Sequence, residues 1–84
     1  MHPPDAAFDL VTRERCHLCD EMKAVLDREL PPLGLGYGVI DVDSDPALAK
    51  RFGEVVPVLL RDGVPVAKVR LDRRRLLRLV RRGR

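Results

Sequence analysis

The chain has 84 residues, 45% of them hydrophobic and 35% charged, and a net charge of +3 at pH 7. This length suits one small domain, residues 1–84, with a thin core. We expect residues 6–82 to be ordered and residues 1–5 to form a frayed lead-in. No apolar run is long enough to span a membrane and the N-terminus lacks the regions of a secretory signal, so we expect a cytoplasmic protein without membrane partners.

The positive charge is concentrated near the C-terminus. Residues 1–60 carry six Lys/Arg and eleven Asp/Glu, whereas residues 61–84 carry ten Lys/Arg and two Asp. A basic run of this kind can contact nucleic acid or an acidic partner. No aromatic residues are interleaved with the arginines and no nucleic-acid-binding motif is present. We therefore interpret the run as the solvated face of a final helix and expect no nucleic-acid partner.

The N-terminal part of the chain predicts a strand and then a helix. Strand formers dominate residues 8–12 and predict a short strand that is at least half buried. In residues 17–30 apolar side chains recur in steps of four, three, one and four, which traces one face of a helix. Pro31 and Pro32 end that helix. The apolar residues of this face are Leu18, Met22, Val25, Leu26 and Leu30.

A second strand at residues 37–42 and a short helix follow. Asp45 suits the N-cap of that helix and Pro46 its first position, while Gly53 marks its C-terminal end. The first two strands flank a helix, so we expect them to be parallel and joined by a right-handed crossover.

The last part of the chain predicts a hairpin and a final helix. Residues 55–60 form the most apolar run, residues 64–69 form the return strand, and Asp62-Gly63 between them is a hairpin signal. Pro65 near the start of the return strand indicates a sheet edge. Asp72 then caps the final helix. The order is strand, helix, strand, helix, strand, strand, helix.

Cys16 and Cys19 are the only two cysteines, and they stand where the first strand gives way to the first helix. A pair with this spacing in a cytosolic protein is more often redox-active or metal-binding than a structural disulfide. At a helix start, unpaired backbone N–H groups and the helix dipole favour a thiolate at Cys16, the species that attacks disulfides. Cys19 lies one turn further along the same face, close enough to form a ring with Cys16.

These features resemble the glutaredoxin-like proteins of the thioredoxin superfamily over roughly residues 7–82. The resemblance rests on Cys16-His17-Leu18-Cys19 after the first strand, on Val56-Pro57 at the third strand, and on Asp62-Gly63 in the hairpin. It implies an α/β fold (an α+β sandwich) of the thioredoxin-like type, ordered β-α-β-α-β-β-α, with a four-stranded mixed sheet and helices on both faces. It also implies a cis peptide bond before Pro57, opposite the cysteine pair, whereas the sequence alone favours a trans proline that starts an edge strand.

The function that the resemblance implies is a small thiol–disulfide oxidoreductase. Cys16 attacks a substrate disulfide or a glutathione mixed disulfide, and Cys19 resolves it. His17 is expected to modulate the Cys16 thiolate, or else to point to solvent. The cis bond to Pro57 is expected to turn the backbone of Val56 towards the pair, so that the N–H and C=O of Val56 pair with an extended peptide or with glutathione. We expect a monomer whose partners are protein disulfides or glutathione, with no cofactor beyond glutathione as a co-substrate and no bound metal.

The same resemblance gives a glutathione role to a basic residue just before the motif and to an acidic residue after the hairpin. Arg13, or alternatively Arg15, is expected to hold a glutathione carboxylate, the alternative being a solvated loop charge. Asp72 is expected to meet the glutathione amine, or to act only as an N-cap.

The chain departs from glutaredoxins at two places. The Gly-Gly pair that usually follows the hairpin is absent from residues 68–72, where the side chains of Val69 and Arg70 are expected to narrow the groove. The motif also lacks the Pro-Tyr dipeptide common in active glutaredoxins. The sequence therefore supports dithiol chemistry better than glutathione binding.

Two alternative functions remain open at this point. One is a non-catalytic interaction module that uses the groove of the fold for a partner. The other is a zinc or iron–sulfur site built from the cysteine pair, with His17 or His2, in a dimer that supplies the missing ligands.

Overall fold

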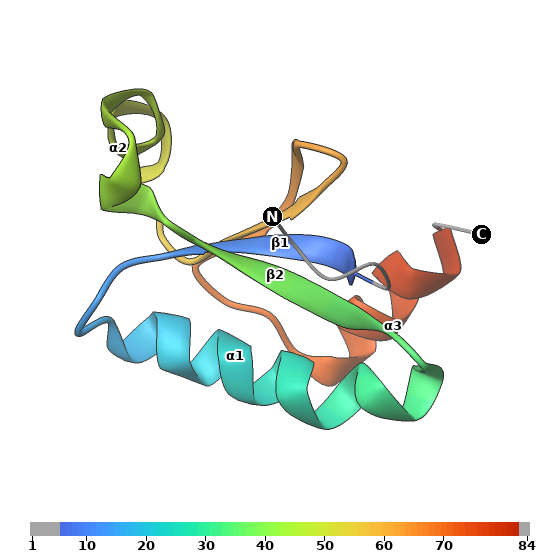
Figure 1. Cartoon of the computed structure of the whole chain (residues 1–84). Coiled ribbons are helices and arrows are strands. Elements are labelled where there is room, and N and C mark those ends of the chain that lie inside the picture. Colours follow the sequence, from blue (N-terminus) through green and yellow to red (C-terminus); the bar gives the residue numbers. More distant parts are fainter. Residues whose placement is uncertain (1–5, 83–84) are drawn as a thin grey trace.

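Figure 1 shows the computed structural model of the chain, which describes residues 6–82. The predicted lead-in at residues 1–5 lies outside the described residues. The main elements are β1 (Ala6–Thr12), α1 (His17–Glu29), β2 (Gly36–Asp41), α2 (Pro46–Phe52), β3 (Val58–Arg61), β4 (Val64–Lys68) and α3 (Arg73–Arg82). Within the described range, no helix combines the length and the apolar character needed to cross a membrane.

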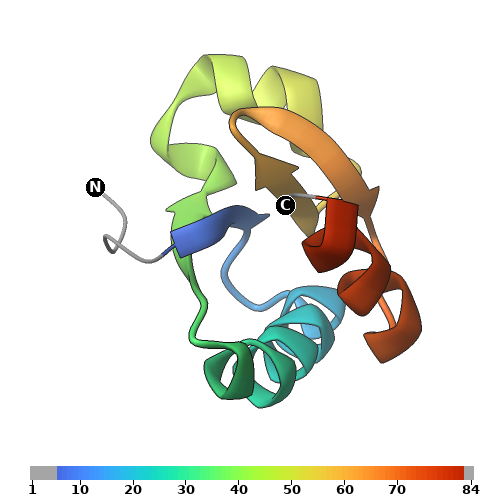
Figure 2. The same ribbon diagram turned by 90° about the vertical axis from the view of Figure 1, so that its right-hand side faces the viewer.

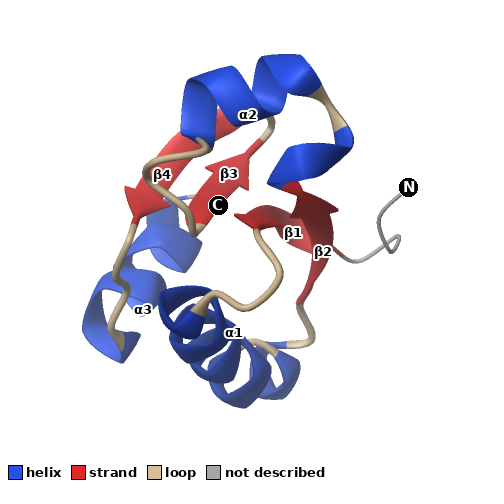
Figure 3. Ribbon diagram, turned by 90° about the vertical axis from the view of Figure 1, so that its left-hand side faces the viewer, coloured by secondary structure: helices blue, strands red, loops and turns tan. Residues whose placement is uncertain are grey.

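The strands form one mixed sheet in the order β2-β1-β3-β4. β1 and β2 are parallel, whereas β3 is antiparallel to both β1 and β4. The predicted parallel pair, the predicted hairpin and the edge position of the strand that contains Pro65 are therefore confirmed. Helices α1 and α3 lie on one face of the sheet and α2 lies on the other, as the two end views show (Figures 2 and 3).

Side chains that alternate along the central strands divide the interior into two cores. On β1, Phe8 and Leu10 belong to the core beneath α1 and α3, whereas Val11 belongs to the core beneath α2. On β3, Leu59 joins the first core, and its neighbours on either side join the second. This alternation follows from the two-residue period of a strand, and it explains why both central strands are buried on both faces.

Two short 3₁₀ helices, η1 (Pro31–Leu33) and η2 (Val42–Ser44), were not predicted. η1 begins at Pro31, whose missing N–H costs nothing at a helix start. η2 is capped by Asp41, whose side chain accepts a hydrogen bond from the N–H of Asp43 at 2.9 Å. Both occupy short connections that the hydrophobic pattern does not distinguish from loops.

The third strand begins later than predicted. Residues 55–57 were expected to lie in it, but β3 starts at Val58. Pro57 carries no N–H for the strand ladder, which explains why regular pairing begins only after it. The peptide bond between Val56 and Pro57 is cis.

The register of the sheet brings three separate segments to one end of it. Val11, near the end of β1, pairs with Val58, the first residue of β3. Val58 in turn pairs with Lys68, the last residue of β4. The loop that follows β1, the segment that precedes β3 and the segment that follows β4 therefore leave the sheet at the same end.

Candidate functional site

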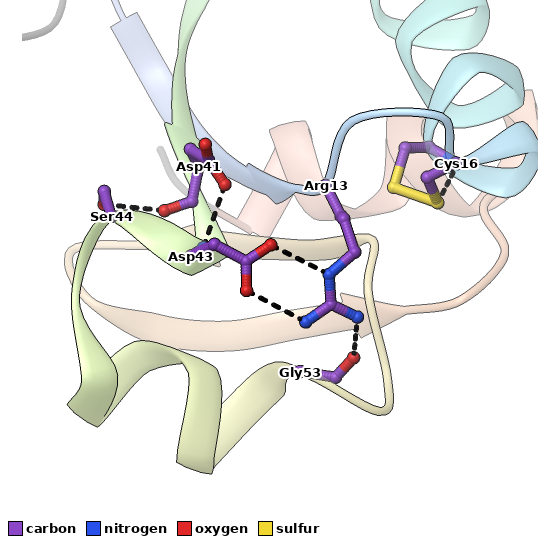
Figure 4. A network of polar contacts seen from close by, with 7 residues as sticks. Arg13, Cys16, Asp41, Asp43, Ser44 and Gly53 are labelled. Atoms are coloured by element: carbon purple, nitrogen blue, oxygen red, sulfur yellow. Dashed lines mark hydrogen bonds and ion pairs between the residues drawn. A yellow bond between two sulfur atoms is a disulfide. The ribbon is translucent and has the colours of Figure 1, made fainter.

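The cysteine pair lies at this end of the sheet, at the N-terminus of α1. Cys16 and Cys19 are joined in a disulfide, and their Cα atoms are 5.1 Å apart. Cys16 is the N-cap of the helix, and its Sγ accepts a hydrogen bond from the backbone N–H of Cys19 at 3.2 Å (Figure 4). Cys16 is half-buried, whereas Cys19 is only 1% exposed. An incoming molecule therefore reaches the first sulfur more readily than the second.

The backbone before the helix sets the position of Cys16. Arg15 has a φ of +56°, which turns the loop, and Cys16 then takes an extended conformation before the first helical residue. The sulfur of Cys16 therefore faces the unpaired N–H groups of the first turn, where the positive end of the helix dipole also lies. Both features favour a negative charge on this sulfur when the disulfide is reduced.

Pro57 and its neighbours lie at the same end of the sheet as the cysteine pair. The Pro57 side chain is fully buried, and its carbonyl accepts a hydrogen bond from the N–H of Val69 at 2.7 Å. Val56 is half-buried and packs against the core beneath α2. This contact fixes the segment before β3 against the segment after β4.

A groove of about 260 Å³ follows α1 from Leu18 to Arg28, and neither cysteine is among its lining residues. Leu18, which stands between the two cysteines, forms one end of its helical wall, and Val69 and Leu71 form part of the opposite wall. The remaining lining residues are Glu21, Met22, Ala24, Val25, Arg28 and Arg70. The groove thus combines apolar walls with charges of both signs. The sequence predicted Val69 and Arg70 at a groove, but it did not predict a groove that runs along α1.

His17 and Asp72 have partners of their own. The His17 side chain is 89% exposed, and its Nε2 lies 3.6 Å from a carboxylate oxygen of Glu21 on the next turn. The carboxylate of Asp72 accepts a hydrogen bond from the N–H of Arg75 at 2.8 Å, so the N-cap predicted for α3 is present. The glutathione role of Asp72 and the modulating role of His17 stay predictions.

Arg13 points away from the disulfide and links the loop after β1 to η2 and to the end of α2 (Figure 4). Its Nε and Nη2 donate to the two carboxylate oxygens of Asp43 at 3.0 and 3.2 Å, and its Nη1 donates to the carbonyl of Gly53 at 2.7 Å. The hydrogen bond from Arg13 lowers the pKa of Asp43, and the same bond raises the pKa of Arg13. The structure therefore gives this guanidinium a role within the fold, and its contact with a glutathione carboxylate stays a prediction.

The arginines of the C-terminal helix contact the rest of the protein at only a few points. Arg73 donates to Glu29 at the end of α1 at 3.0 Å, and Arg75 donates to the carbonyl of Val66 at 3.1 Å. Hydrogen bonds from Arg28 and Arg73 lower the pKa of Glu29. Arg74 and Arg78 are exposed, as expected for the outer face of a helix. Within residues 6–82, no group of three or more His, Cys, Asp or Glu side chains is placed to hold a metal ion.

Comparisons with known proteins add to this geometry. The family model described as a glutaredoxin-like domain matches residues 8–81. A structural genomics target protein from X. campestris, XcR50, is 28% identical with a TM-score of 0.76, covering 90% of this chain and 97% of that one.

Two more distant structures share the fold. Glutaredoxin C1 from Populus tremula x tremuloides, in its holo form, is 16% identical with a TM-score of 0.54, over 93% of this chain and 77% of that one. Fasciola hepatica thioredoxin is 13% identical with a TM-score of 0.60, over 95% and 85% of the two chains. No curated protein matched the sequence. At these identities the two likenesses concern the fold alone, and they agree with the thioredoxin-like arrangement that the sequence predicts.

Proposed function

The chain belongs to the glutaredoxin-like domain family, and from this premise we propose that it is a small thiol–disulfide oxidoreductase. The fold and the close cysteine pair are consistent with a redox role. The observation that carries the proposal is the unequal placement of the two sulfurs. Cys16 caps α1 and is half-buried, whereas Cys19 lies in the helix and is 1% exposed.

The proposed reaction starts from the reduced protein and ends in the disulfide state that the structure holds. The Cys16 thiolate attacks one sulfur of a substrate disulfide, forms a mixed disulfide with it and releases the other substrate sulfur as a thiolate. Cys19 then loses its proton and attacks the Cys16 sulfur, which releases the second substrate thiolate. Two electrons pass to the substrate, and the protein is left with the Cys16–Cys19 disulfide. A thiol such as glutathione, or a dithiol reductase, returns the protein to the dithiol form.

The neighbouring residues take supporting roles in this proposal. The substrate backbone lies beside Val56 and Pro57, at the end of the sheet where the cysteines also stand. His17, the first residue of α1, adds positive charge close to Cys16 when it is protonated and so favours the thiolate. Thiols in general, glutathione among them, are the partners that the family suggests.

A trapping experiment tests this assignment. The Cys19→Ser variant, once reduced, is expected to accumulate a mixed disulfide with a model substrate such as insulin, because the resolving sulfur is missing. The Cys16→Ser variant is the matched control and is expected to form little adduct and to lose turnover. Equal turnover by wild type and Cys16→Ser, or trapping through Cys19 instead of Cys16, would contradict the proposal. Stoichiometric zinc or an iron–sulfur chromophore in the purified protein would favour a metal site instead.

A further inference from the structure

Val69 holds a backbone conformation that its own side chain disfavours. Its φ is +68°, in the left-handed region that glycine occupies at little cost. Among the described residues, the other non-glycine residues with positive φ are Arg15 and Asp62. Neither is β-branched, and Asp is one of the few residue types that visit this region readily. A branched valine at such a position is an outlier, and outliers of this kind gather at ligand-binding sites.

The hydrophobic interior does not account for the valine. Val69 is half-buried, and it belongs neither to the two core clusters nor to the side chains packed against them. Its N–H does bond to the Pro57 carbonyl, which explains why the backbone takes this conformation. A glycine would make the same hydrogen bond without the steric conflict. The fold therefore requires the backbone of Val69 but not its isopropyl group.

Val69 lies instead at the groove along α1, whose lining begins at Leu18, the residue between the two cysteines. Val69 lines this groove together with Leu18, Met22, Val25 and Leu71. The helical wall extends from Leu18 to Arg28, which at 1.5 Å per residue is about 15 Å. An extended peptide advances about 3.3 Å per residue, so a wall of this length suits a segment of roughly four or five residues.

We propose that Val69 is a specificity-determining residue, which makes the protein select extended peptide disulfides with apolar residues next to the reactive cysteine over glutathione. This inference rests on the proposed function, since the selected molecule is the substrate of Cys16. In the mixed disulfide, an apolar substrate side chain packs between Leu18 and Val69. Glutathione has no large apolar side chain to place there.

The test compares three mixed disulfides that release a coloured thiolate in single-turnover reactions. A pentapeptide with leucine on both sides of its cysteine, a matched pentapeptide with glycine at those places, and glutathione are each linked to thionitrobenzoate. The reduced Cys19→Ser protein attacks the peptide or glutathione sulfur through Cys16 and releases thionitrobenzoate, whose colour gives the rate. We expect the leucine peptide to react roughly tenfold faster than the other two, a ratio typical of one small apolar contact.

Variants of two positive-φ residues, Val69 and Asp62, separate an effect on substrate preference from an effect on the stability of the protein. Val69→Gly, in the same Cys19→Ser background, is expected to reduce the preference to about twofold or less, since it removes the contact. It should also raise Tm by a few degrees, because it relieves the left-handed conformation. Asp62→Gly is the matched control: it relieves a positive φ in the hairpin turn, and it should keep the full preference for leucine. A preference that survives Val69→Gly, or that Asp62→Gly also abolishes, would overturn the proposal.

A binding measurement tests peptide binding in the groove separately from the thiol–disulfide reaction of Cys16. A cysteine-free pentapeptide, with serine between the two leucines, is titrated into the oxidised wild-type protein. In NMR spectra we expect the peptide to shift the amide signals of Leu18 and Val69. In the Val69→Gly variant, the amide signals of the other groove residues should shift less than they do in the wild-type protein. If no mixed disulfide forms with any substrate but these shifts appear, the proposed function fails and the assignment of the groove stands. If mixed disulfides form without a preference and no shifts appear, the function stands and the role of Val69 is wrong.

Discussion

The guanidinium of Arg13 is bound to both carboxylate oxygens of Asp43, a residue 30 positions away in the chain. The same guanidinium donates to the Gly53 carbonyl, so the loop that carries Cys16 is tied to η2 and to the end of α2. A planar guanidinium can make these three bonds at once, whereas an ammonium group has no matching fork of donors. The loop before the reactive pair is thereby fixed by contacts on the far side from the sulfurs.

Replacing Arg13 tests whether this side chain serves the fold or the substrate. Arg13→Ala is expected to lower Tm, and Arg13→Lys to lower it nearly as much, because lysine keeps the charge but loses the paired bonds. If the wild-type guanidinium stays bound to Asp43 and does not contact the substrate, neither variant should raise the KM for a glutathione mixed disulfide by more than about twofold. The measurements are thermal unfolding and steady-state kinetics on the same preparations.

Asp43→Asn supplies the control for that prediction. It removes the partner's charge and one of its two acceptor oxygens, while the bond from Arg13 to Gly53 remains. The effect of Asp43→Asn on Tm should therefore not add fully to that of Arg13→Ala in the double variant. An unchanged Tm in Arg13→Ala, together with a large rise in the KM for glutathione substrates, would instead establish the glutathione role predicted from the sequence.

The two cysteines should differ in reactivity once the disulfide is reduced. Cys19 is 1% exposed and Cys16 is half-buried at the helix N-terminus, so iodoacetamide should modify Cys16 first. Peptide mapping by mass spectrometry at successive times gives both rates. In urea the two rates should become similar, and equal rates in the folded protein would remove the basis for naming Cys16 the nucleophile.

The helix that presents Cys16 depends on its buried face. Leu26 lies on α1 and is fully buried in the core that α1 shares with α3. Leu26→Ala should lower the free energy of unfolding by about 2–5 kcal/mol, as is usual when a buried leucine is truncated. Val39→Ala is the comparison, since Val39 is 55% exposed and its loss should cost less than about 0.5 kcal/mol. Urea unfolding followed by circular dichroism measures both, and similar losses for the two variants would contradict the assigned core.

The sequence predicted the local features of this fold better than its long-range contacts. Asp45 caps α2 and Asp72 caps α3 as expected, because a cap depends on residues only two or three positions away. The partners of Arg13 were not predictable, since Asp43 and Gly53 meet it only after the strands pair.

Val69 shows a second limit of local signals. Positive φ is predicted from glycine, asparagine or aspartate, so a valine gives no sign of it. The conformation arises from the bond between the Val69 N–H and Pro57, which again requires the folded sheet. The backbone conformation of Val69 was therefore less predictable than the position of the cysteines.

Tyr37 provides a spectroscopic test of the packing between β2 and α1. Its hydroxyl donates to a carboxylate oxygen of Asp27 at 2.7 Å, and burial together with this bond raises the pKa of Tyr37 well above its ordinary value. Tyr37 is the only tyrosine and the chain has no tryptophan, so absorbance near 295 nm reports this one group. The midpoint of its titration should lie above about 10, the ordinary pKa of tyrosine.

The sign of the effect on stability follows from the raised pKa. The folded state holds the phenol proton more tightly than the unfolded state, so this stabilisation is complete below about pH 10 and is lost as pH rises through the folded pKa. Asp27→Asn should lower the titration midpoint only in part, because the burial of Tyr37 remains. Tyr37→Phe should abolish the absorbance change and flatten the loss of stability above pH 10. A wild-type midpoint at the ordinary value, or a midpoint that Asp27→Asn leaves unmoved, would mean that the bond between β2 and α1 does not persist in solution.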